Sequence, residues 1–330
     1  MESEGKHKSA ILIEDFKERS IECRKYVINS FLMEYIPHES LQKALKHYFS
    51  YWNDYTHPGL FSIAYEACGG ESEHAVKPQA AMAMMAAAFD IHDDIVDKSK
   101  RKHNQTTVYG EFGSDICLLL GNAFLVKGLT LLGDSITELP KENQREIFKV
   151  IKESFFELGL AHAFELQMKK RLDVLPDEYL RILEMKAVGI QVDTNIAALM
   201  AGGTEKEVKT LRDYGRIIGT LATLREEFVD IFDAEELNRR FRKETLPLPL
   251  IFSLQDPKLK ERILRILGKK VTSKDINELA TVVFDTEPVR VVKKKMERLC
   301  EKAKILASHI KNRKSEILLS NLASSMLEDL

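Results

Sequence analysis

Two long stretches of this chain contain no proline, and this absence constrains the fold more than any other feature. No proline occurs between Pro78 and Pro140, or between Pro176 and Pro247. Within these stretches apolar residues recur at three- and four-residue spacing, which is the pattern of amphipathic helices. The only β-like runs are short, such as residues 281–284. The sequence therefore predicts an all-α protein.

The same periodicity predicts helices over most of the chain. The glycine pairs Gly69-Gly70 and Gly202-Gly203 are expected to end helices, because glycine tolerates a left-handed backbone. Ser315 is a candidate cap for a last helix. Since there is no repeat of fixed period and no long linker, one helical domain over residues 1–330 is the simplest interpretation. The predicted helices are 9–35, 39–54, 58–69, 75–98, 114–133, 141–172, 176–201, 205–233, 245–254, 257–268 and 287–329.

Composition excludes several classes of protein. The formal net charge of −2 shows no basic excess of the kind that nucleic-acid binding requires. The four cysteines are far apart and form no CxxC pair, which argues against a disulfide framework or a zinc site. The N-terminus is polar and does not resemble a signal peptide. The longest uncharged stretches, near 78–89 and 116–126, are shorter than the roughly 20 apolar residues of a membrane span. We expect a soluble, cytoplasmic protein with no transmembrane segment.

Four aspartates form the first cluster of possible functional residues. Asp90, Asp93, Asp94 and Asp97 are spaced so that they lie on one face of a helix, where their charges repel one another. The preceding tract, residues 80–89, is wholly apolar, so the helix is expected to be buried. Burying unpaired carboxylates is costly, and Mg²⁺, which prefers oxygen ligands, would relieve both the burial and the repulsion.

A second cluster has the same spacing as part of the first. Glu226, Glu227 and Asp230 follow another apolar stretch, residues 217–224, in a second long predicted helix. Two such helices facing each other across a bundle would make a multi-metal site for a polyanion such as diphosphate. The alternative for both clusters is a solvated acidic face paired with nearby cations. These cations are Lys98, Lys100 and Arg101 for the first cluster and Arg225, Arg239 and Arg240 for the second.

Several segments then resemble those of the trans-isoprenyl diphosphate synthases, the polyprenyl synthetase family. Residues 92–97, His-Asp-Asp-Ile-Val-Asp, resemble the first aspartate-rich motif, DDxxD preceded by histidine. Residues 214–219 resemble the YGRxLG segment before the second motif, and residues 243–248 resemble the GKPTLPL segment. Tyr179 and Lys186 match a tyrosine and a lysine seven residues apart. The matches keep the family's order and spacing.

The resemblance implies a single-domain, isoprenoid-synthase-type helical bundle around a central cavity. An allylic prenyl diphosphate would bind there through Mg²⁺, and loss of its diphosphate would leave an allylic cation. In ordinary members, isopentenyl diphosphate then attacks this cation. The family also implies a homodimer. Carried over by position, the metal ligands are Asp93, Asp94, Asp97, Glu226, Glu227 and Asp230.

The resemblance also assigns roles to other positions. Asp93, Asp94 and Lys186 would be catalytic. The basic residues expected to contact diphosphate are Arg101, Lys102, Lys186 and Lys243. The residues four, five and eight positions before Asp93 would limit the depth of the hydrocarbon tail, and these are Phe89, Ala88 and Met85.

The chain departs from the family where isopentenyl diphosphate should bind. The family's GGKRxRP segment falls on residues 52–58, which places Asp54 on its lysine and Tyr55 and His57 on its arginines. A carboxylate at a diphosphate subsite is repulsive. The second motif, DDxxD in the family, begins here with Glu226-Glu227, whose longer side chains alter the ligand geometry that Mg²⁺ requires.

These departures predict an enzyme that binds Mg²⁺ and ionises an allylic prenyl diphosphate without ordinary isopentenyl diphosphate condensation. Three outcomes remain open. The cation is captured by a different acceptor, or it cyclises or reacts with water as in a class I terpene synthase. In the third, the chain is a non-catalytic, regulatory partner in a heteromer with a complete synthase.

Three further residues have ambiguous roles. His92 is either a hydrogen-bonding partner of a motif carboxylate or a core histidine. His162 and Glu165 lie three residues apart on a predicted helix, but a carboxylate-bundle metal site needs a second such pair, and the sequence has none.

Overall fold

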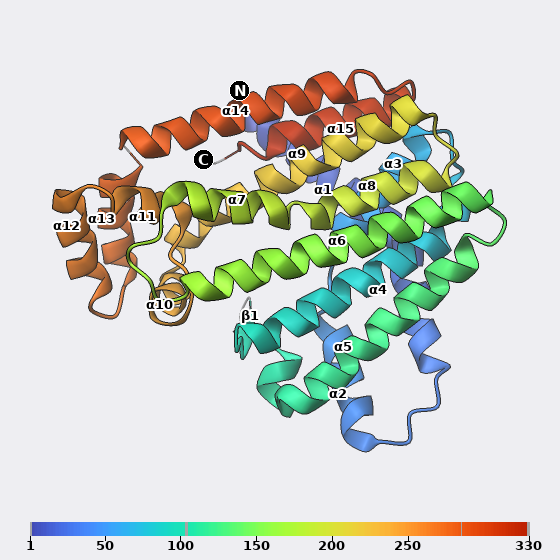
Figure 1. Ribbon diagram of the computed structural model, residues 1–330, viewed down its shortest axis with the longest axis horizontal. Coiled ribbons are helices and arrows are strands. Elements are labelled where there is room, and N and C mark those ends of the chain that lie inside the picture. The colour runs from blue at the N-terminus through green and yellow to red at the C-terminus, as the bar shows by residue number, and fades with distance from the viewer. Residues whose placement is uncertain (1, 103–104, 285, 329–330) are drawn as a thin grey trace.

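The chain folds almost entirely into helices (Figure 1). The structure is a computed structural model that describes residues 2–102, 105–284 and 286–328. Its all-α character confirms the sequence prediction. The first half contains α1 (Glu2–Leu32), α2 (Glu39–Tyr51), α3 (Thr56–Ala67), α4 (Ser72–Val96), β1 (Arg101–Lys102), β2 (Gln105–Thr106), α5 (Val108–Ser135) and α6 (Lys141–Met168). The second half contains α7 (Pro176–Lys186), α8 (Val188–Met200), α9 (Glu205–Val229), the 3₁₀ helix η1 (Asp230–Phe232), α10 (Ala234–Lys243), α11 (Leu248–Ser253), α12 (Pro257–Leu267), α13 (Ser273–Val283), α14 (Glu287–Ala307) and α15 (Arg313–Ser325).

Helix α4 lies at the centre and contributes to both hydrophobic cores of the molecule. It packs against α5 on one side and against α3 and α1 on another. Met82 and Met85 belong to the larger core, which α8 and α9 also enter. Met84 and Ala88 face a second core that includes Tyr48 of α2. Because α4 is surrounded in this way, the carboxylates at its C-terminal end are held at a defined place inside the molecule.

The helix ends follow from local chemistry. Helices end beside Gly69 and Gly202, whose φ angles of 86° and 71° lie in the left-handed region, as predicted. Helix α9 begins at a capping box in which Thr204 and Glu207 satisfy each other's backbone N–H groups. Asn312 caps α15 by accepting a hydrogen bond from the backbone N–H of Ser315. The predicted cap at Ser315 is therefore displaced by three residues.

The structure divides three predicted helices and adds two. The predicted 176–201 helix is α7 and α8, and 287–329 is α14 and α15. The predicted 205–233 helix ends at Val229, and α10 follows η1 because Asp233 accepts hydrogen bonds from the N–H groups of its first turn. The β-like run near 281–284 lies mostly within α13. There tertiary packing overrides a weak β propensity.

Helices α5 and α6 expose an apolar surface, the α5–α6 apolar face. Its exposed members are Leu118, Leu119 and Val126 on α5 and Phe148, Phe156, Leu160 and Phe164 on α6. Within the described residues, α5 is also long and apolar enough to cross a membrane, judged by length and composition alone. The opposite face of α5 packs against α4. Exposed apolar side chains repeated along a helix are typical of a contact with another molecule.

Candidate active site

The four aspartates of α4 divide into two pairs that face different neighbours. Asp93 and Asp97 face the C-terminal end of α6, where His162 Nδ1 lies 3.4 Å from Asp93 Oδ1. Lys169 Nζ donates to Asp97 Oδ1 at 2.8 Å. Both carboxylates are partly exposed, at 29% and 25%. This pair is open enough to accept a ligand.

Asp90 and Asp94 form the other pair, which shares Lys102 of β1. Lys102 Nζ lies 3.0 Å from Asp90 Oδ1 and 2.8 Å from Asp94 Oδ1, and 3.8 Å from Asp93. Burial raises the pKa of Asp94 to about 7, although Lys102 opposes this shift. Lys102, predicted to contact diphosphate, therefore already serves as the counter-ion of α4. Arg101 lies beside it on β1, with its side chain exposed.

The chemistry of Asp93 and Asp97 fits a hard divalent cation. Burial raises the pKa of Asp93, and the negative charge of Asp97 one turn away raises it further. A cation between them would relieve this repulsion, and carboxylate oxygens are the ligands that Mg²⁺ prefers. In the described part of the chain, no three His, Cys, Asp or Glu side chains are already gathered as a metal-binding group. Metal binding by Asp93, Asp94 and Asp97 remains a prediction.

In the second cluster, Arg240 forms ion pairs with two of the three carboxylates. Glu227 is 5% exposed and accepts hydrogen bonds from Arg240 Nη2 at 2.9 and 3.1 Å. It also accepts from Tyr179 Oη at 3.1 Å and from the backbone N–H of Leu248 at 2.6 Å. Arg240 Nη1 donates to Asp230 at 2.6 Å. Glu227 and Asp230 thus tie α9 to α7, α10 and α11, and this geometry leaves little of either for a metal.

Glu226 is the member of the second cluster without such a partner in the described residues. The residue is exposed as a whole, but the surrounding protein removes much of the hydration of its carboxyl group. This partial burial, together with the negative charges of Asp230 and Glu227, raises the pKa of Glu226 to about 7. Bringing a cation close would favour its ionised form. Of the second cluster, Glu226 is therefore the carboxylate whose environment fits a metal best.

Lys186 links the two clusters electrostatically. Its Nζ forms an ion pair with Glu165 of α6. Burial opposes its charge, but Glu165, Asp93 and Glu227 together raise the pKa of Lys186. The same ammonium lowers the pKa values of Asp93 and Glu226. The fold thus gathers both acidic clusters around one cation, and contact of Lys186 with a diphosphate stays a prediction.

The segment after α9 packs beside the C-terminal end of α4. Arg239 Nη1 donates to Ser99 Oγ at 2.7 Å and to Glu244 at the same distance. Lys243 is the last residue of α10 and is exposed. Lys243 therefore lies on the segment that Arg239 holds beside the α4 carboxylates, although no contact with them is recorded.

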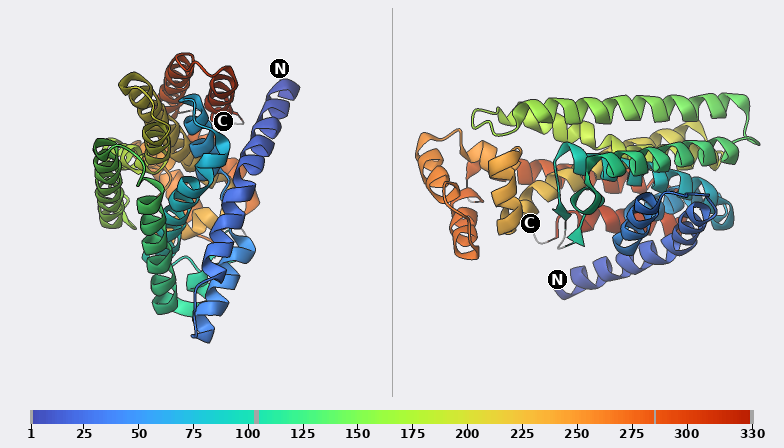
Figure 2. Two further views of the ribbon diagram at one scale, coloured as in Figure 1. Left: turned by 90° about the vertical axis from the view of Figure 1, so that its right-hand side faces the viewer. Right: turned by 90° about the horizontal axis from the view of Figure 1, so that it is seen from below.

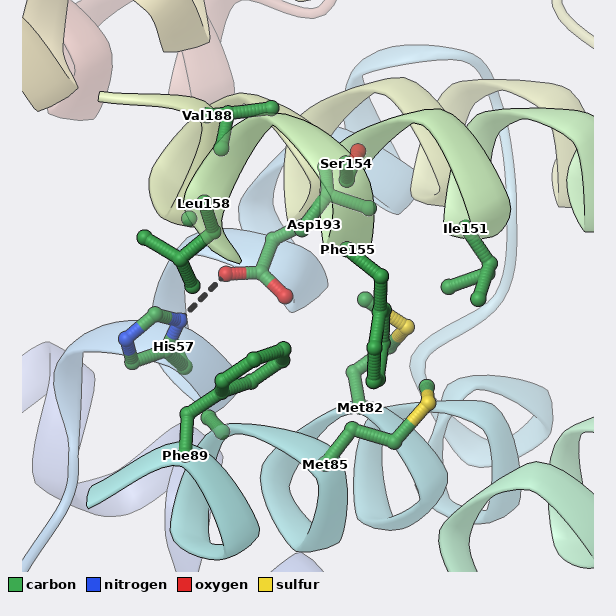
Figure 3. A pocket seen from close by; sticks show the side chains of 13 residues that line it. His57, Met82, Met85, Phe89, Ile151, Ser154, Phe155, Leu158, Val188 and Asp193 are labelled. Carbon is green, nitrogen blue, oxygen red and sulfur yellow. Dashed lines mark hydrogen bonds and ion pairs between the residues drawn. The ribbon is translucent and has the colours of Figure 1, made fainter. Parts of the chain in front are cut away.

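An apolar cavity of about 150 Å³ lies one helical turn before Asp93 (Figure 3). From α4 it is lined by Met82, Met85, Ala86 and Phe89, and from α6 and α8 by mainly apolar side chains. The Phe89 ring packs on Phe155 of α6 with 4.5 Å between ring centroids. Its position and lining suit part of a hydrocarbon tail attached to a group at Asp93.

Two of the three predicted tail residues line this cavity, and the third lies elsewhere. Met85 and Phe89 line it, whereas Ala88 is 1% exposed in the second core. The reason is helical geometry, because positions 82, 85 and 89 share a face that position 88 leaves. Met82 takes the place that the sequence argument assigned to Ala88.

His57 lies between the apolar cavity and a larger polar pocket. The polar pocket, of about 520 Å³, is lined by residues of 48–57, by Asp90 and Asp94, and by residues of 102–107. His57 Nδ1 lies 2.6 Å from Asp193 Oδ2, a fully buried carboxylate of α8 (Figure 3). Burial disfavours the charged ring, but Asp193 and Asp54 outweigh it and raise the pKa of His57 to about 10. The two residues therefore form an imidazolium–carboxylate pair.

Sequence reasoning missed Lys169 and the shared role of its neighbours on α6. His162 and Glu165 lie on α6 and Lys169 follows directly after it, at three- and four-residue spacing that could have placed all three on one face. They belong to the same site as Asp93, so the weak alternative of a separate His-Glu metal site has no support here. His92 Nε2 is buried without a hydrogen-bond partner among the described residues, so neither role predicted for His92 gains support.

A family model described as polyprenyl synthetase matches residues 38–283. Geranylgeranyl diphosphate synthase of Sulfolobus acidocaldarius is 24% identical over 257 residues, which is 76% of this chain and 77% of that protein. A short chain isoprenyl diphosphate synthase of Methanothermobacter thermautotrophicus is 27% identical over 241 residues, 70% of this chain and 72% of that protein.

Solved structures share the fold. The crystal structure of geranylgeranyl pyrophosphate synthetase from Pyrococcus horikoshii superposes with a TM-score of 0.85, at 20% identity, over 98% of this chain and all of that one. A geranylgeranyl pyrophosphate synthetase from Geoglobus acetivorans gives a TM-score of 0.80 at 22% identity, over 95% of this chain and 99% of that one.

Proposed function

The chain belongs to the polyprenyl synthetase family, as its motifs predicted, and from this premise we propose that it ionises an allylic prenyl diphosphate without using isopentenyl diphosphate. It is a prenyltransferase-family enzyme of isoprenoid biosynthesis. The proposal that isopentenyl diphosphate is not used rests mainly on one observation. The α4 carboxylates are split, with Asp93 and Asp97 turned toward His162 and Lys169 and Asp90 and Asp94 turned toward a pocket that Asp54 also lines.

The donor side is the side of Asp93. Mg²⁺ held by Asp93, Asp97 and Glu226 would neutralise the diphosphate and assist its departure. Lys186 and Lys169 add positive charge to this side. The hydrocarbon tail extends into the apolar cavity beneath Asp93, where Phe89 and its neighbours keep water away from the allylic carbons.

The acceptor side argues against isopentenyl diphosphate. Asp54 stands where the family has a lysine, and it lines the polar pocket together with Asp90 and Asp94. The cations that line this pocket, Lys102 and His57, are already paired with carboxylates. A diphosphate entering the pocket would meet net repulsion and lose its hydration.

The proposal is tested by incubating the chain with Mg²⁺ and geranyl, farnesyl or geranylgeranyl diphosphate, with and without isopentenyl diphosphate. Release of pyrophosphate without isopentenyl diphosphate is expected, with products identified by mass spectrometry. A prenyl alcohol or a cyclic hydrocarbon among them would favour the terpene-synthase-like reaction. Efficient elongation by five carbons would contradict the proposed acceptor side. No turnover alone, with a changed product length on mixing with a complete synthase, would favour the regulatory-subunit alternative.

We further propose that the α5–α6 apolar face joins two copies of the chain in a cytoplasmic homodimer. Phe156 is 70% exposed, and the face on α6 continues through Leu160 and Phe164. A second copy would remove this apolar surface from water.

The variant Phe156→Glu is expected to shift the protein from dimer to monomer in size-exclusion chromatography with light scattering. Ile305→Glu, at an equally apolar but separate position that is 59% exposed, serves as the control and should stay dimeric. A monomeric wild type would contradict this proposal.

A further inference from the structure

A charged pair lies in the wall of the apolar cavity. Asp193 of α8 is 1% exposed and lines this cavity, and His57 of α3 lines it as well. His57 Nδ1 donates to Asp193 Oδ2 at 2.6 Å. An ion pair taken out of water adds little to stability, because desolvation offsets most of the Coulomb attraction. The packing of α3 against α8 alone therefore does not explain why a charged pair stands here.

One carboxylate oxygen of Asp193 faces the cavity. Oδ2 is held by His57, but Oδ1 has no recorded hydrogen-bond partner in the described part of the chain. This second oxygen keeps surface that is accessible from the cavity, and Figure 3 shows it turned toward the rings of Phe89 and Phe155. Leaving a buried acceptor unpaired is costly. A buried carboxylate oxygen aimed into a cavity without a partner indicates that a bound ligand interacts with it.

Asp193 lies about one helical turn below the proposed diphosphate site. Phe89 lies across the cavity from Asp193 in Figure 3 and precedes Asp93 by four residues, which is roughly 6 Å along α4. A diphosphate held at Asp93 would therefore place the first carbons of its prenyl group beside Asp193. Met82 and Ile151 lie farther along the cavity, where they would contact the rest of the tail.

We propose that Asp193 is the base that ends the reaction by removing a proton from the allylic cation, and that the product is an unsaturated prenyl hydrocarbon. This inference rests on the proposed function, because it names the fate of the cation formed at the same site. His57 is a positioning residue, whose imidazolium holds the carboxylate in place and keeps it ionised. Burial raises the pKa of Asp193, and His57 opposes this shift. Without His57 the carboxyl group would keep its proton and could not accept another.

The step balances without a further reagent. The C–O bond to diphosphate breaks first, and its electron pair leaves with the diphosphate. The positive charge is then shared by carbons 1 and 3, and a C–H bond breaks in the methyl group on carbon 3 or at carbon 4. The electron pair of this bond forms a new C=C bond, and the proton passes to Asp193 Oδ1. The charged pair is restored when one proton passes to water through the His57 ring, which also lines the polar pocket.

The lining of the cavity favours loss of a proton over addition of water. Apart from His57, Asp193 and Ser154, the residues that line it are apolar. Such a lining leaves little water beside the cation. The carboxylate of Asp193 also attracts the positive charge as it develops. Proton transfer to Asp193 is therefore the step that this geometry supports best.

The product is tested with the full chain, Mg²⁺ and geranyl diphosphate that carries deuterium on the carbon-3 methyl group and on carbon 4. An acyclic triene that has lost one deuterium is expected as the main product, identified by gas chromatography with mass spectrometry. Pyrophosphate release with a product that keeps all its deuterium, whether an alcohol or a cyclic hydrocarbon, would overturn this inference and leave the proposed function standing. No pyrophosphate release from any prenyl donor would overturn the proposed function and this inference with it.

Asp193→Asn keeps the shape of the side chain but removes the base. The ratio of hydrocarbon to alcohol is expected to fall at least tenfold, because the cation persists until it meets water. Since this is a ratio of products, it does not depend on how much of the variant is folded. Asp213→Asn, an exposed aspartate on α9, is the control and should keep the wild-type ratio. An unchanged ratio in Asp193→Asn would overturn the assignment of the base.

His57→Asn tests the positioning role separately. The charged groups that act on Asp193 from the surrounding elements are His57 and Asp54. Once the imidazolium is gone, burial and Asp54 raise the pKa of Asp193, so the base is present above that pKa and is lost below it. The hydrocarbon share of the variant should therefore rise from about pH 6 to about pH 9, whereas that of the wild type should stay level. The same pH profile in both proteins would overturn the role of His57.

Discussion

Asp93→Asn is expected to lower Mg²⁺-dependent release of pyrophosphate from an allylic prenyl diphosphate by roughly 100-fold or more. Asp93 is the partly exposed carboxylate above the tail cavity, where burial and the negative charge of Asp97 raise its pKa. Asparagine keeps its size but removes the charge that would hold the metal. The rate is measured by a coupled pyrophosphate assay at saturating substrate over a range of Mg²⁺ concentrations.

The Asp93→Asn variant, although it loses activity, is not expected to lose stability in the absence of ligand. Removing one of two like charges on α4 relieves repulsion worth some tenths of a kcal/mol, so the free energy of unfolding should stay equal or rise slightly. Loss of activity without loss of stability would separate a catalytic role from a structural one. Asp213→Asn is the matched control and should keep full activity. A rate for Asp93→Asn within threefold of the wild type would contradict the assignment of Asp93.

Arg240→Leu is expected to lower the free energy of unfolding by about 3–5 kcal/mol, because it leaves buried carboxylates without a counter-ion. The Arg240 side chain is 7% exposed and pairs with Glu227 and Asp230, and its Nη2 also donates to Tyr179 Oη at 2.8 Å. Once the guanidinium is removed, Glu227 retains only a hydroxyl and one backbone N–H as donors. The free energy is measured by urea unfolding at pH 7, monitored by circular dichroism.

A double variant distinguishes charge from packing. Adding Glu227→Gln to Arg240→Leu removes the stranded charge while keeping an acceptor for the N–H of Leu248, so part of the lost stability should return. Arg262→Leu removes one partner of an exposed ion pair with Glu278 and should cost at most about 1 kcal/mol. If Arg240→Leu is no more destabilising than Arg262→Leu, the Arg240 network does not hold this end of the bundle together.

Much of the fold could be predicted because helical periodicity is a local property. The apolar spacing placed α4, α6 and α9 in outline, and the glycine pairs ended helices where a left-handed backbone was needed. Short helices were harder. Helix α10 depends on a cap at Asp233 and on the buried guanidinium of Arg240. Because this ten-residue segment is polar, it has no apolar stripe from which a helix could be predicted.

The site was predictable to the extent that its chemistry lies on one helix. The spacing of Asp93 and Asp97, and of Met85 and Phe89, follows from a repeat of 3.6 residues, so their shared face could be read directly. The same repeat does not say which neighbour each side chain meets. It could not show that Lys102 would form ion pairs with Asp90 and Asp94, because these contacts depend on how the β1–β2 hairpin packs against α4.

The sequence by itself determined the helical class, the acidic face of α4 and the loss of positive charge along residues 52–58. Only the tertiary structure decided that this face splits, with Asp93 and Asp97 beside His162 and Lys169 and with Asp90 and Asp94 beside a polar pocket. It also decided that Arg240 forms an ion pair with Glu227, and that His57 contacts Asp193, which lies 136 residues away along the chain. The physical reason is range: helix periodicity is set by neighbours within four residues, whereas ion pairing and burial are set by whichever distant helices pack together.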